Sequence, residues 1–140
     1  MSIYADSSFF VSLYLNDRHA EEAGLRVAKR PSLWLTPLHW VEWTHAIAQH
    51  VFRGIISSAQ AQQFYSAFEL DRERKTWLEV EMPEMAFETA MQLGKQHGPH
   101  LGQRSLDALH VASALELGAE RFWTFDERQA KLAKAVGLRT

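Results

Sequence analysis

The chain has 140 residues, of which 46% are hydrophobic and 23% are charged, a composition typical of one globular domain. Its formal net charge of −2 is not that of a general nucleic-acid-binding protein. No apolar run approaches the ~20 residues of a membrane helix, and the N-terminus lacks the pattern of a secretory signal. The absence of cysteine excludes disulfides and thiolate metal sites and fits a reducing compartment. We therefore expect a single cytoplasmic domain over residues 1–140 with no membrane segment.

Short apolar segments alternate with amphipathic ones along the whole chain. Strands are expected at residues 2–6, 33–36, 77–80 and 121–124, and residues 137–140 resemble the start of a last edge strand. Helices are expected at residues 7–16, 19–29, 38–52, 57–74, 83–96, 104–118 and 126–135, with a turn-rich loop at residues 97–102. Short strands that alternate with helices predict an α/β fold with a mostly parallel sheet.

Four acidic residues occupy comparable places in this pattern. Asp6 and Asp126 follow the first and fourth strands, whereas Glu42 and Asp107 lie on helices. Functional sites in parallel α/β sheets form beyond the carboxyl ends of the strands. The four carboxylates are therefore expected to converge at that edge.

Each carboxylate also has a purely structural interpretation. Asp126, followed by Gln129, resembles a helix N-cap with its capping-box partner. Asp107 lies in a first helical turn, where a negative charge complements the helix dipole, and Asp6 is a possible cap. Glu42 is harder to explain in this way, because it lies mid-helix between two tryptophans, where an unpaired buried charge is costly.

The four carboxylates together indicate a metal site. Two carboxylates ~4 Å apart repel each other by about 4 kcal/mol at an effective dielectric constant of ~20. A cluster of four would destabilise a small domain unless cations or protons neutralised it. Oxygen ligands without cysteine or a histidine pair suit Mg²⁺ or Mn²⁺. Such ions support hydrolysis of phosphodiesters by a metal-oriented water.

Other site types fit the sequence less well. Glu42 and His45 form half of a carboxylate-bridged di-iron motif, but such sites need the motif twice. His110 lies three residues after Asp107, and a core or supporting role is favoured over metal ligation. His97 and His100 fall in the expected loop and are interpreted as solvated. No phosphate-binding glycine motif is present, so no nucleotide cofactor is expected.

Basic and aromatic residues leave further alternatives open. Arg104, one turn before Asp107, has three open interpretations: it offsets the acidic cluster, it holds a scissile phosphate, or it is an ordinary surface residue. Trp40 and Trp43 are favoured as core or interface residues over RNA-stacking residues. The apolar helix around residues 40–52 is a candidate dimer or partner surface. A set of basic residues is interpreted as a solvated face or an RNA-backbone track: Lys29, Arg30, Arg72, Arg74 and Lys75.

The segments YADSS, VEW, RSLDALHVASAL and FWTFD, in this order, resemble the PIN domain, and in particular the VapC-type ribonuclease toxins of toxin–antitoxin modules. The resemblance implies a three-layer α/β/α fold with a sheet of four to five short strands. It also implies that Asp6, Glu42, Asp107 and Asp126 are the catalytic, metal-binding set for Mg²⁺ or Mn²⁺. Thr124, Ser7 and Arg104 would be supporting residues.

The same resemblance implies an activity and partners. The expected activity is endonucleolytic cleavage of single-stranded or loop RNA, which leaves 5′-phosphate and 3′-hydroxyl ends. The expected partners are a second copy of the chain and a cognate antitoxin. The alternative is a catalytically inactive PIN-like module that binds RNA or protein.

Overall fold

The computed structural model describes residues 1–140 without a gap, and its internal contacts divide the chain into two units. The first unit consists of Met1–Asp6 and Glu81–Thr140, and the second of Ser7–Val80. Each unit contains a pair of strands and several helices, and the two are described separately. The organisation of residues 1–140 as a single domain stays a prediction.

The first unit is built on two parallel strands from opposite ends of the chain. Strand β1 (Ser2–Ala5) pairs with β4 (Arg121–Trp123), and Tyr4 is opposite Phe122. The backbone N–H of Asp6 donates to the carbonyl oxygen of Trp123 at 3.0 Å, which extends the pairing by one residue. Because the strands are parallel, the residues that follow each of them emerge at the same edge.

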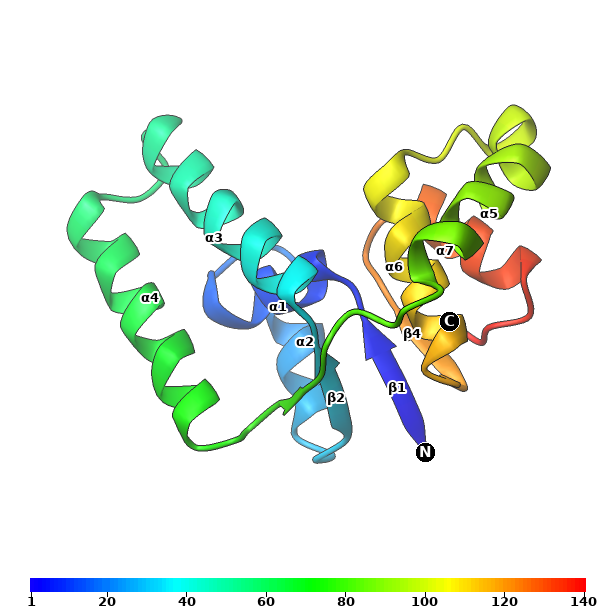
Figure 1. Cartoon of the computed structure of the whole chain (residues 1–140). Helices are drawn as coiled ribbons and strands as arrows, with labels where there is room; N and C mark the ends of the chain where they lie inside the picture. The colour runs from blue at the N-terminus through cyan, green and yellow to red at the C-terminus, as the bar shows by residue number, and fades with distance from the viewer. The chain divides into compact units, whose positions relative to one another are not determined.

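Three helices complete the first unit: α5 (Ala86–Leu101), α6 (Ser105–Glu116) and α7 (Glu127–Ala135). Helices α5 and α6 run side by side (Figure 1). The middle of α6, from Ala108 to Ala114, is buried throughout. The Asp107 helix is therefore a core helix, although Leu106 at its start is 47% exposed.

Two expectations for this unit were wrong in detail. Helix α5 continues through residues 97–102, where a loop was expected, and Pro99 lies inside it. The helix ends at Gly102, whose φ of 64° is easily adopted by glycine. Pro99 leaves the Lys95 carbonyl without its usual helical partner, but the chain keeps helical geometry until the backbone N–H of Gly102 donates to the Gly98 carbonyl at 2.9 Å. The expected last strand at residues 137–140 is reduced to one bridge, between Arg139 and Arg121.

The second unit contains the other two strands. Strand β2 (Ser32–Leu35) pairs in parallel with β3, with Trp34 opposite Leu78. Strand β3 is only Leu78–Glu79, shorter than the expected residues 77–80. The helices of this unit are α1 (Ser7–Tyr14), α2 (Ala20–Val27), α3 (Pro37–Phe52) and α4 (Ser58–Glu73).

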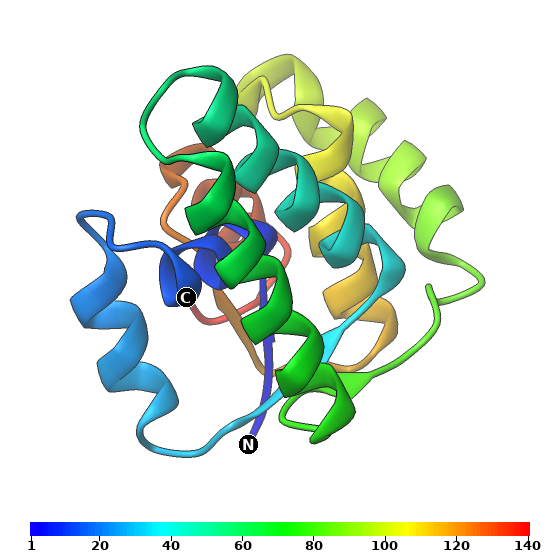
Figure 2. The same cartoon turned by 90° about the vertical axis from the view of Figure 1, so that its left-hand side faces the viewer.

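Helices α3 and α4 pack against each other through aromatic side chains (Figure 2). Trp43 stacks on Phe68 with ring centroids 4.2 Å apart, and Tyr14 of α1 meets both rings edge-on. Trp43 is 1% exposed, which confirms it as a core residue. The Tyr14 hydroxyl donates to Asp71 at 2.5 Å and accepts from Trp77 Nε1 at 3.1 Å. Burial, followed by the bond to Asp71, raises the pKa of Tyr14.

The α/β class predicted from the sequence is confirmed. The chain has seven helices and four strands, and the strand pairs of both units are parallel. The longest helices have 16 residues, and none of the helices is apolar and long enough to cross a bilayer.

Candidate active site

Thr124 links two of the predicted acidic residues at the shared edge of β1 and β4. Its hydroxyl donates to Asp6 Oδ2 at 2.7 Å and accepts from the backbone N–H of Asp126 at 3.0 Å. Asp6 directly follows β1 and is only 4% exposed. Because Asp6 and Thr124 follow paired parallel strands, strand register alone brings them together. A charged acceptor shortens and strengthens such a hydrogen bond.

Asp126 is the N-cap of α7. Its Oδ1 accepts from the backbone N–H of Gln129 at 2.8 Å, which confirms the cap expected from the sequence. The capping-box half of that expectation was wrong, because the Gln129 side chain does not return to the cap backbone. Its Nε2 donates to the carbonyl oxygen of Asp107 at 3.2 Å, and its Oε1 lies 3.1 Å from Thr124 Oγ1. The cap therefore uses one oxygen of Asp126, and no hydrogen bond engages Oδ2.

Gln129 was expected only as a capping-box partner, and its role in the site did not follow from the sequence. It is 1% exposed and joins Asp107 to Thr124, and through Thr124 to Asp6. Asp6, Asp107 and Asp126 thus belong to one hydrogen-bonded network in the first unit. A buried glutamine on a surface helix is a weak signal in sequence, because its partner Asp107 lies 22 residues away.

Asp107 occupies the first turn of α6, and its side chain is 18% exposed. Its Oδ2 accepts a long bond of 3.3 Å from the backbone N–H of Arg104. The guanidinium Nε of Arg104 is 3.7 Å away, and that side chain is 77% exposed. An ion pair of this kind adds little stability. Arg104 is therefore close to the acidic residue but free to move.

A pocket of about 500 Å³ opens beside these groups. Asp107 and Asp126 both line it, together with basic side chains from two elements. The complete lining is Leu101, Arg104, Asp107, Asp126, Glu127, Arg128 and Lys131. Arg128 and Lys131 were not singled out from the sequence, although their i, i+3 spacing puts them on one helical face. The pocket thus combines carboxylates with cations, as a site for a metal ion and an anionic substrate requires.

Glu42 and Ser7 belong to the second unit. Ser7 is buried and its hydroxyl donates to Glu42 Oε1 at 2.8 Å. Glu42 is half-buried in the second turn of α3. The hydrogen bond from Ser7 explains how a carboxylate is accommodated between Trp40 and Trp43.

The donor set suits a hard divalent cation, because all four predicted ligands are carboxylates. Asp107 Oδ1 and Asp126 Oδ2 are the carboxylate oxygens not used in bonds to Arg104 and Gln129, and both residues line the pocket. No group of three or more acidic or histidine side chains is close enough to form a ready coordination shell. The aspartates are instead joined through Thr124 and Gln129.

The histidines singled out from the sequence lie on helices. His110 is 2% exposed, and its Nδ1 lies 2.8 Å from the Tyr4 hydroxyl, so the favoured core role is confirmed. His45 Nδ1 is 2.9 Å from the carbonyl oxygen of Val41, one turn back on its own helix. His97 and His100 lie on α5 and not in a loop. The expected loop was wrong, whereas His100 is exposed and His97 half-exposed.

Comparisons with known proteins identify the fold. The model of one family, the PIN domain, matches residues 3–135. The chain is similar in structure to the Mycobacterium tuberculosis toxin VapC20, a sarcin-ricin loop cleaving toxin. The TM-score is 0.72 at 19% identity, covering 98% of this chain and 96% of that one. It is also similar to a chain of VapBC2 from Rickettsia felis, solved bound to a DNA fragment from its promoter. There the TM-score is 0.63 at 14% identity, with coverage of 98% and 96%. No curated protein sequence matches the chain.

Proposed function

Because the chain belongs to the PIN domain family, we propose that it is a metal-dependent endoribonuclease and the toxin of a VapBC-type toxin–antitoxin pair. The observation that carries the proposal is the network in which Thr124 and Gln129 join Asp6, Asp107 and Asp126. A module with no catalytic role has no need to gather three acidic residues, whose like charges repel, into one hydrogen-bonded network.

In this proposal Asp6 and Asp107 are the principal ligands of Mg²⁺ or Mn²⁺, and Asp126 and Glu42 complete the set directly or through water. A bound divalent ion would lower the pKa of a water and stabilise negative charge on a phosphoryl oxygen. Asp126 Oδ2 and Asp107 Oδ1 offer oxygens toward the pocket that both residues line. Glu42 is retained from the sequence pattern and from its hydrogen bond to Ser7, the residue after Asp6.

The remaining residues orient groups and attract the substrate. Thr124 holds the Asp6 carboxylate in one orientation, and Gln129 fixes the start of α6 through the Asp107 carbonyl. The cations Arg104, Arg128 and Lys131 line the same pocket and would offset the charge of a phosphodiester backbone. RNA is proposed as the substrate because a protein of similar structure is described as a toxin that cleaves the sarcin-ricin loop.

The partners follow from the same likeness. The Rickettsia felis structure is a toxin–antitoxin complex, and we propose a cognate antitoxin for this chain as well as a homodimer in the cytoplasm. Exposed apolar side chains at the end of α3 and just after it are the candidate surface: Phe52 is 88% exposed and Ile55 62% exposed. Sedimentation of wild type and Phe52→Ser should show a dimer that the substitution weakens. A wild type that stays monomeric at high concentration would leave this surface to the antitoxin.

Cleavage of labelled RNA tests the main proposal. Wild type should cut in Mg²⁺ or Mn²⁺ and lose activity in EDTA, whereas Asp6→Asn and Asp107→Asn should be inactive in either metal. Glu88→Gln, an exposed carboxylate on α5, is the matched control and should cut normally. In the absence of RNA, Mn²⁺ should raise the melting temperature of wild type and of the control but not of Asp107→Asn. A wild type with neither cleavage nor metal stabilisation would support the inactive binding module.

A further inference from the structure

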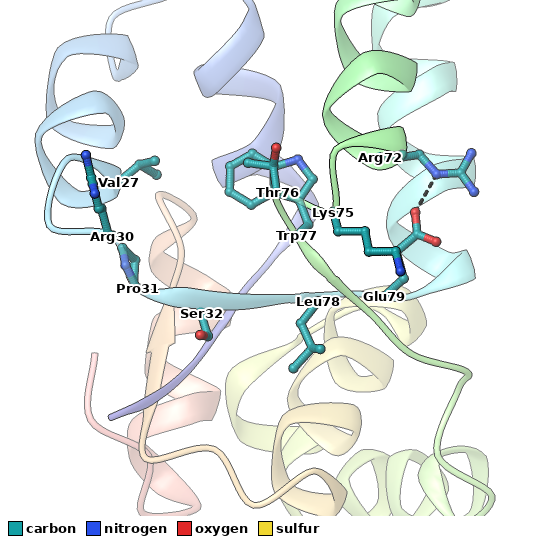
Figure 3. A pocket seen from close by; sticks show the side chains of 10 residues that line it. All are labelled: Val27, Arg30, Pro31, Ser32, Arg72, Lys75, Thr76, Trp77, Leu78 and Glu79. Carbon is teal, nitrogen blue, oxygen red and sulfur yellow. Dashed lines mark hydrogen bonds and ion pairs between the residues drawn. The ribbon is translucent and has the colours of Figure 1, made fainter.

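The second unit has a pocket of its own, unrelated to the acidic network. Its volume is about 750 Å³, within the ~300–1,000 Å³ range of small-molecule sites. It lies among the end of α2, β2, the end of α4 and β3 (Figure 3). Three of its lining side chains are cationic and one is acidic, so its wall is net positive: Arg30, Arg72 and Lys75 against Glu79.

Two of these cations sit on unusual backbone. Arg30 and Lys75 have φ values of 54° and 55° and are the only non-glycine residues of the chain with positive φ. Each follows a helix: Arg30 N–H donates to the Val27 carbonyl, and Lys75 N–H to the Arg72 carbonyl. The other positive-φ positions of the chain are glycines: Gly54, Gly102, Gly118 and Gly137. Glycine adopts this conformation at least cost. Two helix ends therefore carry a cationic residue where glycine would be more favourable, and both border the same pocket.

The side chains at those two positions are available to a ligand. Arg30 and Lys75 are exposed, and neither side chain forms a hydrogen bond or ion pair. Arg72 is different, because it is held by Glu79 at 2.6 Å and by Glu69 at 2.9 Å and lies 4.0 Å from the Trp40 ring. Arg72 therefore forms a fixed wall, while Arg30 and Lys75 carry uncompensated charge.

We propose that this pocket binds the phosphate group of a nucleotide, either within an RNA strand or as a free nucleotide. Arg30 lies on one side of the pocket and Arg72 on the other (Figure 3), so a bound anion would meet cations from both sides. The hydroxyls of Ser32 and Thr76 add donors, and Leu78, 51% exposed, offers an apolar surface to a base or ribose. For the RNA source the inference rests on the proposed function; for a free nucleotide it does not.

A charge-matched pair of double variants tests the pocket. The test variant is Arg30→Gln with Lys75→Gln, and the control is Lys29→Gln with Arg74→Gln. The control residues are the chain neighbours of the test residues and are exposed, but they do not line the pocket. A third variant, Arg30→Gly with Lys75→Gly, removes the same charges and places the residue best suited to positive φ. Its melting temperature should equal or exceed that of wild type, which rules out misfolding as the cause of any weaker binding.

Binding is measured in EDTA, so that no cleavage is needed. Fluorescence anisotropy follows a labelled 12-nucleotide RNA, and ¹H–¹⁵N NMR follows adenosine 5′-monophosphate. The test variant should bind RNA roughly tenfold more weakly at low salt, with a salt dependence of log K reduced by about 1.4, or ~0.7 for each phosphate that is no longer neutralised. The control should resemble wild type. In NMR, the amides of Ser32, Lys75 and Thr76 should shift on addition of the mononucleotide.

The two probes separate the sources. If only RNA binding depends on Arg30 and Lys75, the pocket is a subsite for an RNA strand. If binding of the mononucleotide also depends on them, the pocket is a site for a free nucleotide. Equal reductions in the test and control variants, or no binding of either probe, would overturn the inference. A wild type that binds either probe through this pocket but does not cleave RNA would contradict the proposed function and still support the inference.

Discussion

Replacement of Thr124 by valine removes a hydroxyl that supports the acidic site and leaves the acidic residues unchanged. Valine has nearly the same shape, but it removes the donor to Asp6 Oδ2 at 2.7 Å and the acceptor for the Asp126 N–H at 3.0 Å. A hydrogen bond to a charged group contributes about 1.5–3 kcal/mol and a neutral one about 1 kcal/mol. Thr124 is half-buried, so water replaces part of this stabilisation. We expect a net loss of about 2 kcal/mol.

The assay is urea unfolding followed by circular dichroism, with thermal melting beside it. In a chain of this size, about 2 kcal/mol corresponds to a melting temperature lower by roughly 8 °C. Thr124→Ser keeps the hydroxyl and serves as the control, so it should lie close to wild type. A positioning role also predicts that Thr124→Val needs more Mn²⁺ for half-maximal cleavage, which general destabilisation would not cause. The reasoning is refuted if the valine and serine variants unfold together and share one Mn²⁺ dependence.

Three further outcomes follow from the same hydrogen bonds and their neighbours. Gln129→Leu removes the side-chain donor to the Asp107 carbonyl from a residue that is 1% exposed, and should lower the free energy of unfolding by about 1 kcal/mol in urea titrations. Asp126→Asn keeps the cap of α7 and Asp126→Ala does not, so the alanine variant should unfold with about 1 kcal/mol less free energy, while both lose most Mn²⁺ stabilisation. The raised pKa of Tyr14 means that the folded state keeps a proton that the unfolded chain releases above about pH 10. The contribution of this group to the free energy of unfolding is therefore fully present below about pH 10 and should be lost above that pH, by up to about 1.4 kcal/mol per pH unit. The loss should be smaller in Tyr14→Phe.

The order of strands and helices was largely predictable, because strong periodicity and turn residues mark most boundaries. The prediction failed where local and tertiary signals disagree. Residues 97–102 contain two glycines and a proline and were expected to be a loop, yet α5 passes through them to Gly102. Glycine and proline are only statistical breakers of helices, so a single sequence does not reveal that the helix continues through them. Similarly, β3 has only two residues, although the backbone N–H of Val80 still donates to the Leu35 carbonyl at 3.0 Å.

The acidic positions were accessible from the sequence because strand ends and helix starts constrain them. Asp126 was correctly identified as a cap, and Thr124 lies against Asp6 as a supporting hydroxyl would. Gln129 was assigned to the wrong partner, since a local capping pattern considers only neighbours within one turn. Its true partner, Asp107, is on another helix. The basic wall of Arg128 and Lys131 escaped notice because charged residues on a surface helix have no distinguishing pattern.

The dual use of Asp126 affects how inactive descendants of such a chain can be recognised. Helix α7 needs an oxygen acceptor at position 126 whether or not RNA is ever cut, so asparagine, serine or threonine would persist there by selection for folding alone. Asp107 has a weaker structural duty, because it accepts one long bond of 3.3 Å from the backbone N–H of Arg104, the N-cap of α6. Loss of the acid at position 107 would therefore indicate loss of activity. A polar residue at position 126 would not distinguish active from inactive chains.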